Sequence, residues 1–231
     1  MKQLQYLGST NSNPAIMKFI IATLLAYTSG AFTAAVPLEQ SADIAQSANF
    51  DYVQNYNGNA AQFKYNQAQG TYSVKWAGGT NFVTGLGWSR GGPRTIKYSG
   101  TYSPVNSGSF FGAYGWLENP LTEYYVVESF GTYDPCADKT AKQHVTFKSA
   151  DGLSSYKVCS NIRTNQPSIH GTATFKQFFS VRQGMRTSGT INTGEHFSHW
   201  AKHGFANKNF GTMSFITEAW SGSGSASVTL S

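Results

Sequence analysis

Acidic residues are scarce in this chain of 231 residues. It has only 11 Asp and Glu against 17 Lys and Arg, which gives a formal net charge of +6. The basic residues are scattered without a consecutive run, so the sequence does not predict a nucleic-acid partner. Because a buried charge is costly unless it is compensated, an acid inside an apolar segment of such a chain indicates a chemical role.

Hydrophobic runs long enough to span a membrane are also lacking. The apolar run at residues 19–27 is too short for a stable anchor. It follows Lys18 and precedes small residues at 33–35, a pattern typical of a secretory signal. We therefore predict a secreted protein with no membrane association after signal removal. The expected parts are a gene-model extension at 1–16, a signal peptide at 17–35, a short pro-segment at 36–48 and one folded domain at 49–231; the alternative for the apolar run is a buried N-terminal helix.

Cysteine is limited to two residues, Cys136 and Cys159. An even pair in a secreted protein predicts one disulfide, which excludes a free thiol and stabilises the fold by roughly 3 kcal/mol. Asn-x-Ser/Thr motifs are absent, so N-linked glycosylation is not expected.

Short segments of alternating polarity, separated by Gly, Asn, Asp and Pro, fill the chain from residue 50 onward. They predict an all-β jelly roll of two curved, mostly antiparallel sheets that form a cleft. One short α-helix on the back is expected from Thr193, as its N-cap, to Gly204, since Phe197, Trp200 and Ala201 share a helical face. The expected strands lie at 71–76, 82–88, 95–102, 109–116, 123–130, 144–148, 155–159, 172–182, 186–191, 213–220 and 226–230.

Two glutamates, Glu123 and Glu218, lie within aromatic segments of this kind. Two carboxylates flanking a glycosidic bond are the minimal apparatus for cutting a sugar chain. Alternation places Glu128 on the strand face opposite to Glu123, so Glu128 is interpreted as structural. Sugar rings stack on aromatic side chains. Candidates for the inner face of the cleft, each of which is otherwise core, are Tyr56, Trp76 or Trp88, Tyr114, Trp116, Tyr125, Phe179 and Trp220.

These segments resemble the signatures of the glycoside hydrolase family-11 endo-1,4-β-xylanases, in particular the secreted fungal ones. Pro-Leu-x-Glu-Tyr-Tyr-Val-Val-Glu stands at 120–128 and Phe-x-x-Glu-Ala-Trp-Ser-Gly-Ser-Gly at 215–224, both without gaps. The resemblance extends over 49–231. It implies an enzyme that hydrolyses internal β-1,4 bonds of xylan without a metal or cofactor, and we expect it to act as a monomer.

By motif, the resemblance implies that Glu123 is the nucleophile. It implies that Glu218 is first the general acid and then the general base. Such enzymes retain the anomeric configuration by a double displacement through a covalent glycosyl-enzyme, for which the carboxyl groups lie roughly 5–5.5 Å apart.

The resemblance also assigns roles around this pair. Arg163 and Gln177 match cleft-lining positions, and Pro167 matches the tip of a hairpin, the thumb, that closes over the substrate. Asn81 matches the neighbour of the acid/base glutamate; Asn at this position implies an optimum of roughly pH 5 to 7, higher than Asp would give. Thr212 departs from a Tyr that many members carry, which puts a substrate-binding hydroxyl in question. The remaining substrate-binding candidates are Tyr56, Tyr114, Trp116 and Tyr125.

Other interpretations stay open on sequence alone. A non-catalytic carbohydrate-binding jelly roll would use the same aromatic cleft, as would an endo-β-1,4-glucanase. A secreted elicitor recognised by plant receptors is a third possibility.

His196, His199 and His203 lack the His-Glu-x-x-His order of a metal site, so they are expected to pack, whereas His144 and His170 are expected at the surface.

Overall fold

The computed structural model of this protein describes residues 50–58 and 62–231, with the backbone alone for 54–58. The predicted extension at 1–16, signal at 17–35 and pro-segment at 36–48 lie outside the described residues. In the part that is described, no helix has the length and hydropathy of a membrane span.

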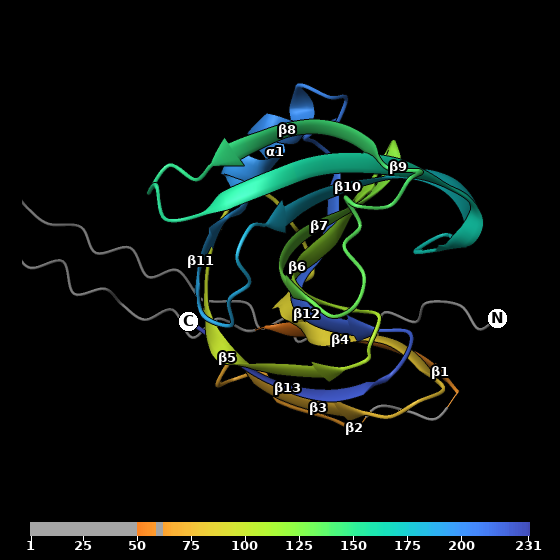
Figure 1. The fold of residues 1–231 in the computed structure, drawn as a ribbon, viewed down its shortest axis with the longest axis vertical. Helices are drawn as coiled ribbons and strands as arrows, with labels where there is room; N and C mark the ends of the chain where they lie inside the picture. The colour runs from red at the N-terminus through yellow and green to blue at the C-terminus, as the bar shows by residue number, and fades with distance from the viewer. Residues whose placement is uncertain (1–49, 59–61) are drawn as a thin grey trace, which may run out of the picture. The chain divides into compact units, whose positions relative to one another are not determined.

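Strands dominate the described residues and form two sheets, as the alternating pattern predicts (Figure 1). The larger sheet has the order β1 (Asp51–Gly58), β4 (Thr80–Trp88), β12 (Phe210–Ala219), β6 (Ser109–Glu118), β7 (Leu121–Phe130), β10 (Gly171–Arg182), β9 (Ser155–Ser168) and β8 (Lys142–Lys148). The smaller has the order β11 (Gly189–Asn192), β5 (Thr95–Val105), β13 (Ser223–Leu230), β3 (Thr71–Trp76) and β2 (Gln62–Asn66). Neighbouring strands are antiparallel except β7 and β10, which are parallel. The expected jelly roll is confirmed.

The main apolar core lies between the two sheets. Leu86, Phe111 and Phe215 of the larger sheet are completely buried there, in one cluster with Tyr72 and Val228 of the smaller sheet. Burial of each such side chain contributes roughly 1.5–3 kcal/mol. This core covers one face of the larger sheet, so the other face is left for the site.

The other face of the larger sheet is nevertheless apolar and largely buried. Tyr114, Tyr125 and Phe179 are each at most 5% exposed and belong to a second cluster on this face. The segment that carries Tyr133 and Cys136 covers part of this face, and the curl of the sheet, which bulges bend locally, buries the rest. One register shift lies between Phe111 and Gly112 on β6, where a Cβ at Gly112 would stand 2.0 Å from the carbonyl oxygen of Val126. Glycine at this point therefore permits the close approach of β6 to β7 at the register shift.

The hairpin of β9 and β10 is longer than the sequence pattern predicts. The expected strand at 155–159 continues to Ser168, which pairs with Gly171 at the end of the hairpin. The prediction was too short because residues 160–168 are mostly polar and read as a loop. Cross-strand hydrogen bonds to β10 hold them extended instead. Strands β1 and β2 were also missing from the expected set.

Helix α1 (Thr193–Ala201) is the expected helix with different ends. Its N-cap is Asn192, not Thr193. The Thr193 hydroxyl accepts from the Arg94 backbone N–H at 2.8 Å and donates to the Gly92 carbonyl at 3.1 Å, so it holds a neighbouring segment and is not free to cap. Ala201 is exposed, so only Phe197 and Trp200 of the expected apolar face are buried.

Candidate active site

Glu123 on β7 and Glu218 on β12 flank strand β6, on which their register partners are Trp116 and Phe110. Six residues along a flat strand would separate these two positions by about 20 Å. The curl of the sheet brings the side chains together instead, because the Tyr125 hydroxyl reaches both. It donates a hydrogen bond to Glu123 Oε1 at 3.1 Å and lies close enough to Glu218 to lower the pKa of that carboxyl.

Glu123 is 7% exposed and is held by neutral donors. Tyr125 donates to Oε1, and Gln177 Nε2 donates to Oε2. Burial raises the pKa of Glu123 to about 7, while the bonds from Gln177, Tyr125 and Tyr114 and the charge of Arg163 act in the opposite direction. The carboxyl is therefore poised to lose its proton near neutral pH.

Glu218 has fewer donors than Glu123. It is partly exposed at the surface of the cleft, but its Oε2 is buried and has no hydrogen-bond partner within residues 50–58 and 62–231. Burial, and then the charge of Glu123, raise the pKa of Glu218 to about 8, against smaller opposing effects of Tyr125 and Arg163. Between the two pKa values, Glu123 is ionised and Glu218 keeps its proton.

A pocket of about 380 Å³ opens beside the pair. It contains several residues that the sequence singles out: Asn81, Tyr125, Arg163, Gln177, Phe179, Glu218 and Trp220. Asn81 lies two residues from Val83, the register partner of Glu218, and on the same strand face. The expected proximity of Asn81 to Glu218 is thus consistent with the sheet register.

Three expected cleft residues, Trp116, Trp76 and Trp88, do not line this pocket. Trp116 is only 1% exposed, packs on Phe175 and donates from Nε1 to the Tyr114 hydroxyl at 2.6 Å. It has no free face for a sugar ring, so the prediction that it binds substrate is revised: Trp116 positions Tyr114. Trp76 lies in the core between the sheets and Trp88 packs against that core, so neither belongs to the cleft. The prediction that Trp76 or Trp88 lines the cleft was wrong, because alternation along a strand does not say which face of the sheet forms the cleft.

Two further candidates, Pro167 and Tyr56, are placed by their strand pairing. Pro167 is exposed on β9 and pairs with Thr172, close to the turn of the hairpin. The backbone of Tyr56 pairs with Phe82 of β4, and its side chain lies outside the described residues.

Three lining residues of the pocket, Phe110, Tyr133 and Asn161, were missed by the sequence reasoning. Asn161 alternates with Arg163 along β9, so a longer predicted strand would have found it. Tyr133 lies in an irregular segment and has no pattern that could reveal it.

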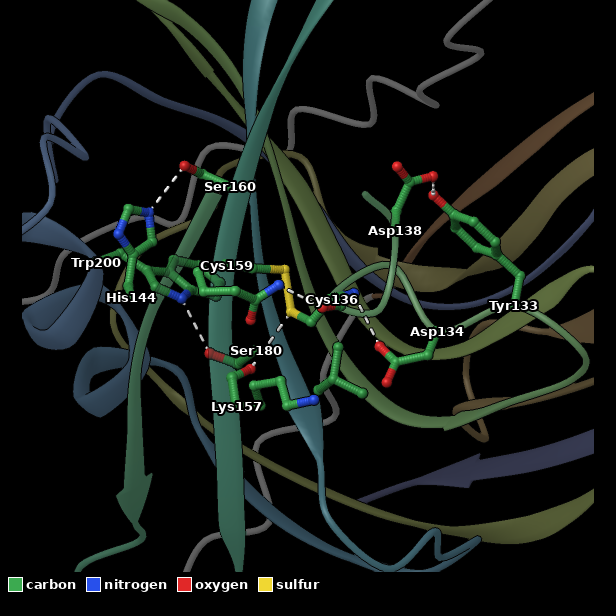
Figure 2. Close-up of a disulfide and its surroundings, with 12 residues drawn as sticks. Tyr133, Asp134, Cys136, Asp138, His144, Lys157, Cys159, Ser160, Ser180 and Trp200 are labelled. Carbon is green, nitrogen blue, oxygen red and sulfur yellow. Dashed lines mark hydrogen bonds between the residues drawn. A yellow bond between two sulfur atoms is a disulfide. The ribbon is translucent and has the colours of Figure 1, made fainter. Parts of the chain in front are cut away.

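The predicted disulfide between Cys136 and Cys159 is confirmed, with the Cα atoms 5.5 Å apart (Figure 2). It joins the segment that carries Tyr133 to strand β9. Within that segment the Tyr133 hydroxyl donates to Asp138 Oδ2 at 2.9 Å, and the Cys136 N–H donates to Asp134 Oδ1 at 2.8 Å. These bonds fix the wall of the pocket that Tyr133 supplies.

The histidines of α1 and of the turn that follows it pack, as expected. The His196 ring lies edge-on to Tyr156, His199 stacks on Phe147, and His203 stacks on His144 with ring centroids 4.2 Å apart. His144 was expected at the surface but is half-buried by this contact. Over the described residues, no group of three His, Cys, Asp or Glu side chains is arranged to hold a metal ion.

The chain is similar to known proteins in both sequence and fold. The model of glycosyl hydrolases family 11 matches residues 48–229. Endo-1,4-beta-xylanase B of Talaromyces purpureogenus is 51% identical over 185 residues, which cover 79% of this chain and 88% of that relative. Endo-1,4-beta-xylanase A of Aureobasidium pullulans is 50% identical over 226 residues, covering 93% and 100%. A solved endo-1,4-beta-xylanase structure from Trichoderma reesei superposes with a TM-score of 0.69 at 36% identity, covering 77% of this chain and 96% of that one.

Proposed function

We propose that this chain, which belongs to glycosyl hydrolases family 11, is a secreted endo-1,4-β-xylanase that cuts internal bonds of xylan with retention of configuration. The observation that carries the proposal is the pair Glu123 and Glu218, joined through Tyr125 at one pocket, with the pKa of Glu218 raised further than that of Glu123. An ionised nucleophile beside a protonated acid is what the first step of a retaining glycosidase needs.

In the first step, the Glu123 carboxylate attacks the anomeric carbon of the bound sugar. Glu218 gives its proton to the glycosidic oxygen, the bond between that oxygen and the anomeric carbon breaks, and the leaving chain departs with a free hydroxyl. The hydrogen bonds from Gln177 and Tyr125 hold Glu123 in place for this attack. The product is an ester between Glu123 and the remaining sugar chain.

In the second step, Glu218 acts as a base. Once Glu123 is esterified its negative charge is gone, and with it the repulsion that helps to raise the pKa of Glu218. Glu218 can then take a proton from a water molecule. The water oxygen attacks the anomeric carbon and releases the Glu123 carboxylate, so two inversions give net retention.

Reducing ends released from xylan test the activity, and the anomer that forms first, followed by NMR, tests retention. We expect the β-anomer to appear before mutarotation. An α-anomer as the first product would overturn the double displacement, and equal rates for the wild type and Glu123→Ala would remove Glu123 as the nucleophile.

A second measurement tests the substrate. Rates on xylan and on carboxymethyl cellulose should differ strongly, because we expect the aromatic side chains of Phe110, Tyr133 and Trp220 in the pocket wall to crowd the hydroxymethyl group of glucose. Comparable rates on both would indicate a glucanase instead. A non-catalytic carbohydrate-binding role is not favoured, since both glutamates of the family signatures are present.

Secretion and a monomeric state are part of the proposal. The disulfide supports secretion, because disulfides persist in oxidising compartments. Recovery of a chain starting after residue 35 from the culture medium, and its elution as a monomer in gel filtration, would check both.

A further inference from the structure

An unpartnered acceptor lies in the wall of the active-site pocket. Oδ1 of Asn161 is buried and has no hydrogen-bond partner within the described parts of the chain, 50–58 and 62–231. Buried polar atoms in folded proteins are nearly always hydrogen-bonded, and those without a partner often await a ligand or another group. Glu218 Oε2 is a second unpartnered atom in the same pocket, and the proposed mechanism gives it the glycosidic oxygen as its partner.

The position of Asn161 relates it directly to the nucleophile. Glu123 on β7, Gln177 on β10 and Asn161 on β9 are register partners on three adjacent strands. Register partners on one sheet face form a lateral row, so the Asn161 Cα lies about 10 Å from that of Glu123. Gln177, in the middle of the row, donates to Glu123. A sugar seated over Glu123 and Gln177 therefore has Asn161 at its edge.

The disulfide makes this position rigid. Cys159 lies two residues before Asn161 on the same face of β9 and is completely buried. Its bond to Cys136 ties β9 to the segment that carries Tyr133, and Tyr133 and Asn161 line the same pocket. An acceptor held in this way loses little freedom when a ligand binds, which favours affinity.

We propose that Oδ1 of Asn161 accepts a hydrogen bond from a ring hydroxyl of the xylan sugar bound over Glu123 and Gln177. This inference rests on the proposed xylanase function. Since Oδ1 is an acceptor, its partner must be a donor, and the donors of an unbranched xylose unit are its hydroxyl groups. A hydroxyl that carries an arabinose or glucuronate branch has lost its hydrogen. Asn161 therefore selects for an unbranched sugar at this position.

The test compares Asn161→Ala with Ile162→Ala. Ile162 is the next residue on β9, is 67% exposed and points away from the cleft, so it is a matched control. On unbranched xylohexaose, Asn161→Ala should lower kcat/KM about tenfold, mainly by raising KM, while Ile162→Ala should stay within twofold of the wild type. The preference for unbranched over branched oligosaccharides should fall in Asn161→Ala. Its melting temperature should not fall, because the change removes a group that lacks a partner in the free protein.

A binding measurement separates this inference from the proposed function. Calorimetry of xylohexaose on Glu218→Gln, with and without Asn161→Ala, does not depend on hydrolysis, and the second change should weaken binding about tenfold. Equal binding, an unchanged kcat/KM, or a lower melting temperature with an unchanged KM would overturn the role of Asn161. A wild-type protein that leaves xylan intact would instead refute the proposed function.

Discussion

Glu123 and Glu128 are five residues apart on strand β7 and face opposite sides of the larger sheet. They differ in the charge of the groups that they contact. Glu123 is 7% exposed and Glu128 is completely buried. Glu128 pairs with Arg186, whose Nε lies 2.5 Å from Oε2, and it accepts from the hydroxyls of Tyr98 at 2.5 Å and Tyr156 at 2.6 Å. Glu123 accepts from neutral groups, Tyr125 and Gln177.

The difference lies in the partner charge. The Arg186 guanidinium compensates Glu128 permanently, and although burial alone would lower the pKa of Arg186, the charge of Glu128 raises it. Among the described residues no cation forms an ion pair with Glu123, so burial raises its pKa to about 7 against the weaker effect of the Arg163 charge. A carboxylate that is paired with a cation is a poor nucleophile. Such an ion pair instead links two segments of the fold. Reactivity on this strand therefore follows from leaving one buried carboxylate without a counter-ion.

The largest expected effect concerns activity. Glu123→Gln should lower kcat on xylan by more than about 10⁴-fold, as is typical when a residue at the centre of the chemistry is removed. Glu128→Gln, the matched change on the other face, should keep kcat per folded molecule within a few fold. Measurement of kcat at a temperature where both variants are folded checks this contrast. A comparable loss in both variants would mean that the two faces do not differ in role.

The next effect concerns stability, where the order reverses. Glu128→Gln should lower the free energy of unfolding by about 3 kcal/mol, because Arg186 is left without its counter-charge in a largely buried site. Denaturant unfolding measures it. The double variant Glu128→Gln/Arg186→Met should recover part of the loss, since no unpaired charge remains. If Glu128→Gln alone unfolds at the wild-type midpoint, the ion pair contributes nothing.

A smaller change in the free energy of unfolding, of opposite sign, is expected for Glu218→Gln. Its pKa in the folded protein, about 8, lies above the ordinary value of 4.5, so the folded state holds a proton that the unfolded state gives up. Stability is therefore lost as pH rises from 4.5 through about 8. Glu218→Gln should raise the free energy of unfolding by at least about 1 kcal/mol near pH 8 and by almost nothing near pH 4. A gain that is the same at both values would rule out titration as its cause.

The smallest expected effect is a shift in pH dependence. The profile of kcat/KM should be bell-shaped, with Glu123 on the acid limb and Glu218 on the alkaline limb. Asn81→Asp places a second carboxyl beside Glu218, where the two can share a proton. The optimum should then move down by about one pH unit. Asn81→Ala is the control, and an equal shift in that variant would exclude the carboxyl as the cause.

Particular residues show how far sequence reasoning reached. Glu123 and Glu218 were assigned from the two long motifs, and Gln177 and Arg163 from their match to cleft-lining positions of the family. The structure places Glu218, Gln177 and Arg163 at one pocket. Asn161 was missed because its segment is polar and is held extended only by pairing with β10. Tyr133 was missed because its position depends on the Cys136–Cys159 bond rather than on any periodicity. Trp116 was misplaced because exposure on a curled face cannot be read from alternation.

The sequence by itself determined that Glu123 and Glu128 lie on opposite faces, because the period of two in a strand follows from backbone geometry alone. Only the tertiary structure determined which side chains contact each glutamate. Arg186 reaches Glu128 across 58 residues of chain, and Glu218 approaches Glu123 only because the larger sheet curls over its own face. Such contacts depend on strand register, bulges and curvature, which are set by the whole fold and not by the residues next to each glutamate.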